Sequence, residues 1–114
     1  MKLLKTLEQI LNGTNWEPVH EDGNHYGFRW LGGDYDGYIT LTGDTMEELA
    51  EDAYAAYENF DVDQETALWI GDDGHGKNGA PYHIRDILEE FENYERDLEF
   101  LWDTLRNEQT RQEA

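Results

Sequence analysis

The chain has 114 residues, of which 27 are acidic and 8 are basic, so its formal net charge is −19. A surface this acidic repels phosphate backbones and anionic lipids, which argues against direct binding of nucleic acid or membranes. Hydrophobic residues make up 38% and aromatic residues 13%, a composition typical of a folded protein rather than a disordered acidic tail. We therefore expect one domain spanning residues 1–114, without a membrane span and located in the cytoplasm, where a chain without cysteine is ordinary.

The first forty residues predict one helix followed by a small sheet. Apolar residues recur at helical spacing over residues 3–11, and Asn12-Gly13 supplies a stop signal. From residue 16 to residue 42 the pattern changes to short runs of aromatic and β-branched residues, separated by the turn sequences "EDGN" and "GGDYDG". This pattern predicts a three-stranded antiparallel meander. Pro18 places the first strand at an edge, because proline cannot donate to a neighbouring strand.

The rest of the chain predicts helices. Thr45 and Glu48 form a capping box that begins a helix ending near Asn59, and Asp63 is expected to cap a short helix through "QETALWI". A long last helix is expected from Tyr82, with residues 107–114 frayed. Its near-heptad apolar stripe comprises Ile84, Ile87, Leu88, Phe91, Tyr94, Leu98, Leu101, Trp102 and Leu105. The predicted fold class is α+β: an N-terminal helix, the meander, then two shorter helices and a long C-terminal helix packed on one face of the sheet.

The residue types argue against an enzyme. Serine and cysteine are both absent, so the usual nucleophile–histidine arrangements cannot form, and no phosphate-binding glycine motif is present. Asp72, Asp73 and His75 on the loop "DDGHGKNG" offer possible metal ligands, but the EF-hand and zinc spacings both fail. A glycine-rich connector is the simpler interpretation of this loop, and whether it binds a metal stays open. We expect no catalytic residue, no metal site and no cofactor.

The distribution of charge is the strongest functional signal. Between Arg29 and Lys77 there are thirteen acidic residues and no basic one. On the last helix, eight acidic residues between Asp86 and Asp103 are opposed by Arg96 alone. At ~1.5 Å per residue these eight span roughly 26 Å, or about one charge per 3 Å, close to the ~3.4 Å spacing of phosphates along one DNA strand.

Two acidic ridges, one on each of the long predicted helices, form the candidate binding surface. We expect their carboxylates to stand in for phosphates and to occupy the basic groove of a nucleic-acid-binding protein by competition. The protein would act as a monomer or a small homodimer. The candidate partner-binding residues are Glu47, Glu48, Glu51, Asp52, Glu89, Glu92, Glu99 and Asp103.

The C-terminal part of the chain resembles a group of small acidic proteins encoded by phages and conjugative elements. The resemblance runs over residues 60–105, two-fifths of the chain, and lies in "FDVDQETALWI" and "NGAPYHIRDILEEFENYERDLEFLWDTL". The group has no established activity, so no functional residue carries over. What the resemblance implies is context, since mobile elements often encode inhibitors of host defence, including antirestriction and anti-CRISPR proteins, many of them acidic nucleic-acid mimics.

Two other interpretations of the acidity stay open. A run of charge is usually a solvated face, and salt-adapted proteins are acidic and poor in lysine, as is this chain with three lysines. The protein could also be an accessory or scaffold protein of a mobile element that acts through helix-mediated contacts along its apolar stripe, with the acidity serving solubility only. The acidic residues cluster between Asp34 and Asp73 and along the last helix, and this uneven distribution favours an interaction surface.

Overall fold

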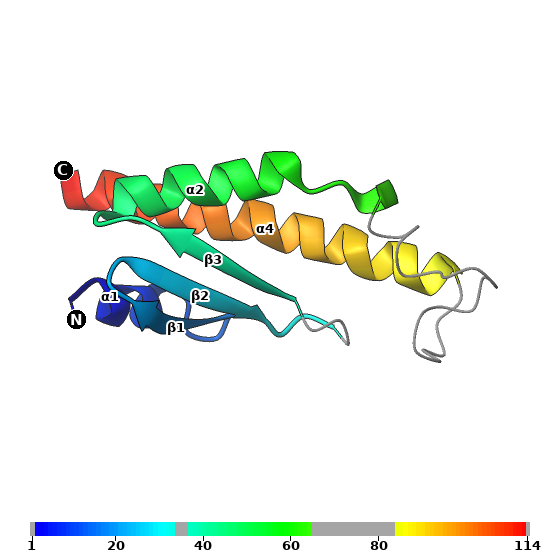
Figure 1. Cartoon of the computed structure of the whole chain (residues 1–114), viewed down its shortest axis with the longest axis horizontal. Coiled ribbons are helices and arrows are strands. Elements are labelled where there is room, and N and C mark those ends of the chain that lie inside the picture. The colour runs from blue at the N-terminus through cyan, green and yellow to red at the C-terminus, as the bar shows by residue number, and fades with distance from the viewer. Residues whose placement is uncertain (1, 34–36, 65–83, 114) are drawn as a thin grey trace.

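A computed structural model of the chain describes residues 2–33, 37–64 and 84–113, with elements in the order α1-β1-β2-β3-α2-α4 (Figure 1). The sheet is antiparallel with strand order β1-β2-β3, and α2 lies along α4 beside it. The predicted α+β class is confirmed, with the N-terminal helix, the three-stranded meander, a helix after it and the long C-terminal helix in the predicted order. The bounds are Lys2–Ile10 for α1, Trp16–Asp22 for β1, His25–Trp30 for β2, Tyr38–Thr42 for β3, Met46–Asn59 for α2 and Ile84–Glu113 for α4.

The sheet follows the turn chemistry of the sequence. β1 and β2 are joined at Gly23-Asn24, where Gly23 has a φ of 55°, a conformation that glycine adopts at little cost. Trp16 pairs with Trp30 across β1 and β2, and Phe28 pairs with Ile39 across β2 and β3. β1 is an edge strand, as Pro18 predicts.

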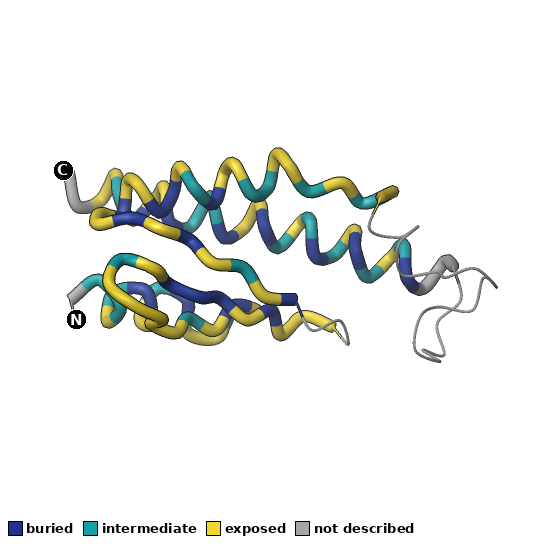
Figure 2. Tube along the Cα trace, viewed as in Figure 1, coloured by how far each residue is buried: buried dark blue, intermediate teal, exposed yellow. Residues whose placement is uncertain are grey.

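One face of the sheet supplies most of the aromatic core. Alternation along β2 places Tyr26, Phe28 and Trp30 on the same face, and all three are buried. Tyr94 of α4 packs edge-on against Trp16 and Trp30, with ring centroids 5.8 Å and 5.1 Å apart. In Figure 2 the buried segments of β2, α2 and α4 face one another, and α1 adds its apolar side to the same core.

Asp97 joins α4 to the sheet through two tryptophan indoles. Its Oδ2 accepts hydrogen bonds from Nε1 of Trp30 at 2.7 Å and from Nδ2 of Asn15 at 3.0 Å. Its main-chain oxygen accepts one from Nε1 of Trp16 at 2.8 Å. Gly32 leaves room for this contact, since a Cβ there would lie 2.6 Å from the Trp30 nitrogen. These bonds satisfy donors on two large buried side chains and fix how α4 is rotated on the sheet.

The outer face of the sheet is polar and held together by Glu21. Tyr38 crosses above Gly27, and its hydroxyl donates to Oε1 of Glu21 at 2.6 Å. Thr40 donates to the other oxygen of Glu21 at 3.0 Å. The hydrogen bond from Tyr38, followed by that from Thr40, holds the pKa of Glu21 below its ordinary value. This face is therefore a solvated sheet surface with its own hydrogen-bond network.

The structure confirms one predicted helix cap and corrects another. Thr45 caps α2 by accepting from the Glu48 amide at 3.2 Å, as predicted. The next helical turn, residues 62–64, is capped by Asp61, whose Oδ1 accepts from the Gln64 amide at 3.1 Å, so the prediction of Asp63 as the cap was wrong. Asp61 precedes Gln64 by the three residues that a cap requires.

The expected fraying of residues 107–114 was also wrong for residues 107–113, because α4 runs to Glu113. Glu108, buried to 8% exposure, and an ion pair between Glu108 and Arg111 at 3.2 Å hold the last turns. Apolar periodicity ends at Leu105 and could not show this. The predicted helix start at Tyr82, Trp69 with the rest of "ETALWI", and the Asp72–His75 loop lie outside the described residues.

Replacing Asp97 is expected to loosen α4 from the sheet. Asp97→Ala leaves the buried indole N–H of Trp30 without this acceptor, and we expect the free energy of unfolding to fall by about 2 kcal/mol. Asp97→Asn keeps an acceptor oxygen and should lose less. Urea denaturation followed by tryptophan fluorescence measures both variants, with Glu89→Ala on the exposed side of α4 as the control. Equal stability of Asp97→Ala and the control would contradict the assigned role.

Candidate functional site

The candidate site lies along the seam between α2 and α4, which run antiparallel (Figure 1). Near the start of α4, Phe60 packs against Tyr94 with ring centroids 5.0 Å apart. Further along, the Tyr57 hydroxyl donates to Oε2 of Glu99 at 3.2 Å, and Tyr54 lies 4.8 Å from Trp102, centroid to centroid. From Tyr54 to Phe60 the residue numbers rise towards the end of α2, while the numbers of their partners on α4 fall, as expected for antiparallel helices.

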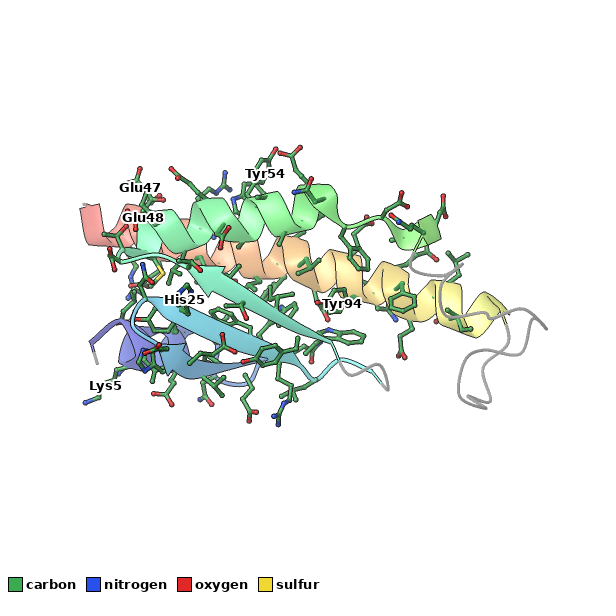
Figure 3. The ribbon with its side chains drawn as sticks, in the orientation of Figure 1. Lys5, His25, Glu47, Glu48, Tyr54 and Tyr94 are labelled. Atoms are coloured by element: carbon green, nitrogen blue, oxygen red, sulfur yellow. The ribbon has the colours of Figure 1, made fainter. Side chains whose placement is uncertain are left out.

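This arrangement puts two rows of acidic residues beside one another. Side chains three or four residues apart share a face of a helix. On α2, Glu51 follows Glu47 by four residues and Glu58 follows Glu51 by seven, which is about two turns; all three are exposed, and we name them the α2 row. Figure 3 shows Glu47 and Tyr54 projecting from the side of α2 that faces away from the sheet. On α4 the same spacing connects the residues that we name the α4 row: Glu92, Glu95, Glu99 and Asp103.

The two rows meet at an open groove where α2 ends. The groove has a volume of about 640 Å³ and combines carboxylates with an apolar surface. Its apolar part comes from Phe60, Val62 and Leu88. We name it the acidic groove, and its carboxylates are Glu58, Asp61, Asp63, Glu92 and Glu95.

Electrostatics make this end of α2 attractive to cations. The carbonyl end of a helix carries a partial negative charge and is normally balanced by a basic side chain. The last turn of α2 has no basic residue and contains Glu58 instead. Among the described residues that line the groove, none is basic. A lysine or arginine side chain fits this chemistry, with its charged head among carboxylates and its stem on the apolar surface.

The structure separates the eight candidate residues into groups. Glu47 and Glu51 lie in the α2 row, and Glu92, Glu99 and Asp103 lie in the α4 row. Asp103 is partly neutralised by Arg106, whose guanidinium lies 2.8 Å from its Oδ1 and also stacks on Trp102.

Two of the candidate residues serve the fold instead. Glu48 accepts a hydrogen bond from the Asp44 amide at 2.7 Å, and Asp52 accepts one from the Thr42 amide at 2.9 Å. Both carboxylates are therefore directed to the chain segments that precede α2. Glu89 is exposed, but by helical geometry it lies on the side of α4 turned away from α2.

Four carboxylates of the acidic groove were not among the candidates: Glu58, Asp61, Asp63 and Glu95. The sequence already places Glu58 in the acidic ridge of this helix with Glu47 and Glu51. Asp61 and Asp63 follow α2 in a segment whose path the sequence does not define. Glu95 lies next to Arg96 in the sequence, yet the two side chains leave the helix about 100° apart.

Comparisons with other proteins add nothing to this geometry: no family model matches the chain, and neither curated proteins nor solved structures gave a match.

Within residues 2–33, 37–64 and 84–113, no three histidine or carboxylate side chains are placed to hold one metal ion. In the same ranges, no helix has the length and apolar character needed to cross a membrane.

The pKa values of Tyr54 and Tyr57 report on the acidic residues along the seam between α2 and α4. The hydrogen bond to Glu99 raises the pKa of Tyr57, and Glu58 raises the pKa of Tyr54 in the same way. The phenol is the favoured form in the folded protein. Any stability that Tyr57 gains from Glu99 is therefore complete below the unfolded pKa of about 10 and is lost as the pH rises through the higher folded pKa.

Glu99→Gln is expected to lower the pKa of Tyr57 towards its ordinary value, because it removes the carboxylate that disfavours the phenolate. NMR titration of ring-labelled tyrosine measures this pKa separately from those of the other tyrosines. Glu89→Gln, on the other side of α4, is the matched control and should leave the Tyr57 pKa unchanged. The same pKa in all three proteins would show that Tyr57 and Glu99 do not interact in solution.

Proposed function

We propose that the protein is a non-enzymatic acidic inhibitor or decoy that occupies the basic nucleic-acid-binding groove of a host defence protein or another DNA- or RNA-handling protein. The observation that supports this most directly is the acidic groove. It gathers five carboxylates at the carbonyl end of α2, together with an apolar surface and no basic lining residue among those described. This chemistry suits the lysine and arginine side chains that normally contact phosphates.

The two rows extend this surface beyond the groove. From Glu92 to Asp103 the α4 row covers about 17 Å of helix, a span of several nucleotide phosphates along one strand. The α2 row lies beside it and ends in the same groove. Long-range attraction from the net charge would speed the encounter, and the aligned carboxylates would then replace phosphates one by one.

The exposure of these side chains suits binding better than catalysis. Four of the five groove carboxylates are exposed, and Glu95 is half-buried. A carboxyl group that acts as a general acid near neutral pH usually needs a desolvated site that raises its pKa. Exposed carboxylates instead suit salt-sensitive contacts with cations.

The scaffold interpretation needs the apolar stripe of the last helix, and that stripe forms part of the core. Ile87, Phe91, Tyr94, Leu98, Leu101 and Leu105 are all at most 4% exposed. Tyr94, Leu98, Leu101 and Leu105 belong to the same core cluster as the sheet and α2, so a partner could reach these four only by displacing those elements. The stripe is therefore a packing feature of this domain, and the acidic surface is the better candidate for contact with a partner.

Charge reversal in the groove tests the proposal. The variant Glu58→Lys, Glu92→Lys, Glu95→Lys is expected to lose partner binding, because three of the five groove carboxylates become repulsive. The immobilised protein is used to capture partners from a bacterial lysate at ~50 mM salt, where charges are weakly screened, and at ~500 mM salt, where they are strongly screened. We expect one nucleic-acid-binding protein at low salt, released by added DNA or by high salt.

The matched control is Glu8→Lys, Glu17→Lys, Asp22→Lys, which reverses three exposed acids on α1 and β1. Each reversal adds two charges, so both triple variants have a net charge of −13 in place of −19. Loss of binding in the groove variant alone supports the site. Equal loss in both variants would mean that only net charge matters, and capture unaffected by DNA and salt would contradict phosphate mimicry.

A further inference from the structure

A second surface lies on α4, on the side turned away from the sheet, and it adjoins the α4 row at Asp103, which belongs to both. Its residues follow helical spacing and include one large apolar side chain, Phe100, which is 47% exposed. The surface carries two acidic and two basic residues, so it is balanced in charge although the whole chain is not. We name it the α4 outer face, and it comprises Glu89, Asn93, Arg96, Phe100, Asp103, Asn107 and Arg111.

The charges of the α4 outer face are arranged as opposites about Phe100. Arg96 lies four residues before Phe100 and Asp103 lies three residues after it. Glu89 lies eleven residues before Phe100 and Arg111 eleven residues after it, while two asparagines lie seven residues to either side. Two such helices that cross antiparallel at Phe100 would place every charge near an opposite one and each asparagine near an asparagine.

The basic residues of this face are accessible for such pairing. Arg96 donates to Oδ1 of Asn93, and among the described residues it forms no ion pair, although Glu92 and Glu99 lie one turn away. The Arg111 side chain is 79% exposed while it contacts Glu108. A hollow of about 440 Å³ adjoins Phe100 and is lined also by Arg96, Glu99, Trp102 and Asp103. An apolar side chain from outside can enter there.

We propose that this face binds a second copy of the chain, in a symmetric homodimer whose two-fold axis passes close to Phe100. Such an interface is self-complementary, because Arg96 of one copy meets Asp103 of the other and the reverse pair forms at the same time. The two Phe100 rings fill the centre. Because each copy contributes one helix, the buried area is at the small end for specific interfaces, and the dimer is weak and concentration-dependent.

The response to salt distinguishes this dimer from the binding of a basic partner. Two chains that each carry −19 repel one another at long range, and salt screens that repulsion. Exposed ion pairs contribute little to the stability of a dimer. Salt therefore weakens the ion pairs by less than it reduces the long-range repulsion between the two chains. Dimerisation is therefore expected to strengthen as salt rises, whereas binding through the acidic groove weakens.

A pair of charge variants tests the pairing. In Arg96→Glu, a glutamate faces Asp103 of the other copy, and in Asp103→Arg, an arginine faces Arg96. Each variant alone should dimerise at least tenfold more weakly than the wild type, by sedimentation equilibrium at ~150 mM salt, where a charge pair in contact is screened little. An equal mixture should recover association, because both pairs across the mixed interface are then of opposite sign.

Unimpaired dimerisation of either variant, or a mixture no better than its components, would overturn the proposal, as would a monomeric wild type at millimolar concentration. A cross-link provides an independent test should Asp103→Arg fail to fold. The chain has no cysteine, so Phe100→Cys introduces a single thiol that should form a disulfide-linked dimer under mild oxidation. Ala55→Cys on the exposed side of α2 is the control, and equal cross-linking of both would exclude contact at residue 100.

Discussion

The contact between Asp97 and the indoles of Trp16 and Trp30 determines which side chains of α4 face the sheet, which face α2 and which face solvent. Three hydrogen bonds attach one short side chain and its carbonyl to the end of the sheet. A 30-residue helix has many ways to roll on an apolar surface, and these directional bonds select one. With Asp97 turned towards the sheet, the residues on its other flank turn towards α2, and Phe100 turns to solvent.

Asp97 is also an example of why the net charge of the chain does not describe the acidic surface that is open to a partner. Glu21, Glu48, Asp52 and Asp97 all accept hydrogen bonds from their own chain, three of them from main-chain amides or an indole. These acids stabilise turns, helix starts and the junction between helix and sheet. The acids that remain for a partner are concentrated along the seam of α2 and α4, while the α4 outer face is electrically balanced. The chain therefore has distinct charged surfaces, not one uniform acidic coat.

Sequence periodicity was sufficient for the type and order of the described helices and strands and for most of the described core. The stripe from Ile87 to Leu105 and the alternation of Tyr26, Phe28 and Trp30 identify buried faces without any knowledge of the partner element. The site was less predictable, because it depends on how α2 and α4 are oriented and rotated. Asp52 looks like Glu47 and Glu51 in the sequence, and only the position of β3 shows that its carboxylate accepts a hydrogen bond from the Thr42 amide. Similarly, nothing local shows that Asp61 and Asp63 return towards Glu92 and Glu95.

The two proposed surfaces of α4 are compatible and together suggest how a small protein could cover a long basic surface. The acidic groove reaches α4 between Leu88 and Glu95, five to twelve residues before Phe100. In an antiparallel dimer centred on Phe100, the two grooves lie on opposite sides of the axis, roughly 25 Å apart along the helices. Each groove alone makes few contacts, and binding of the first raises the effective concentration of the second. Because salt weakens groove binding and strengthens the dimer, their combined affinity should depend less steeply on salt than that of a monomeric phosphate mimic.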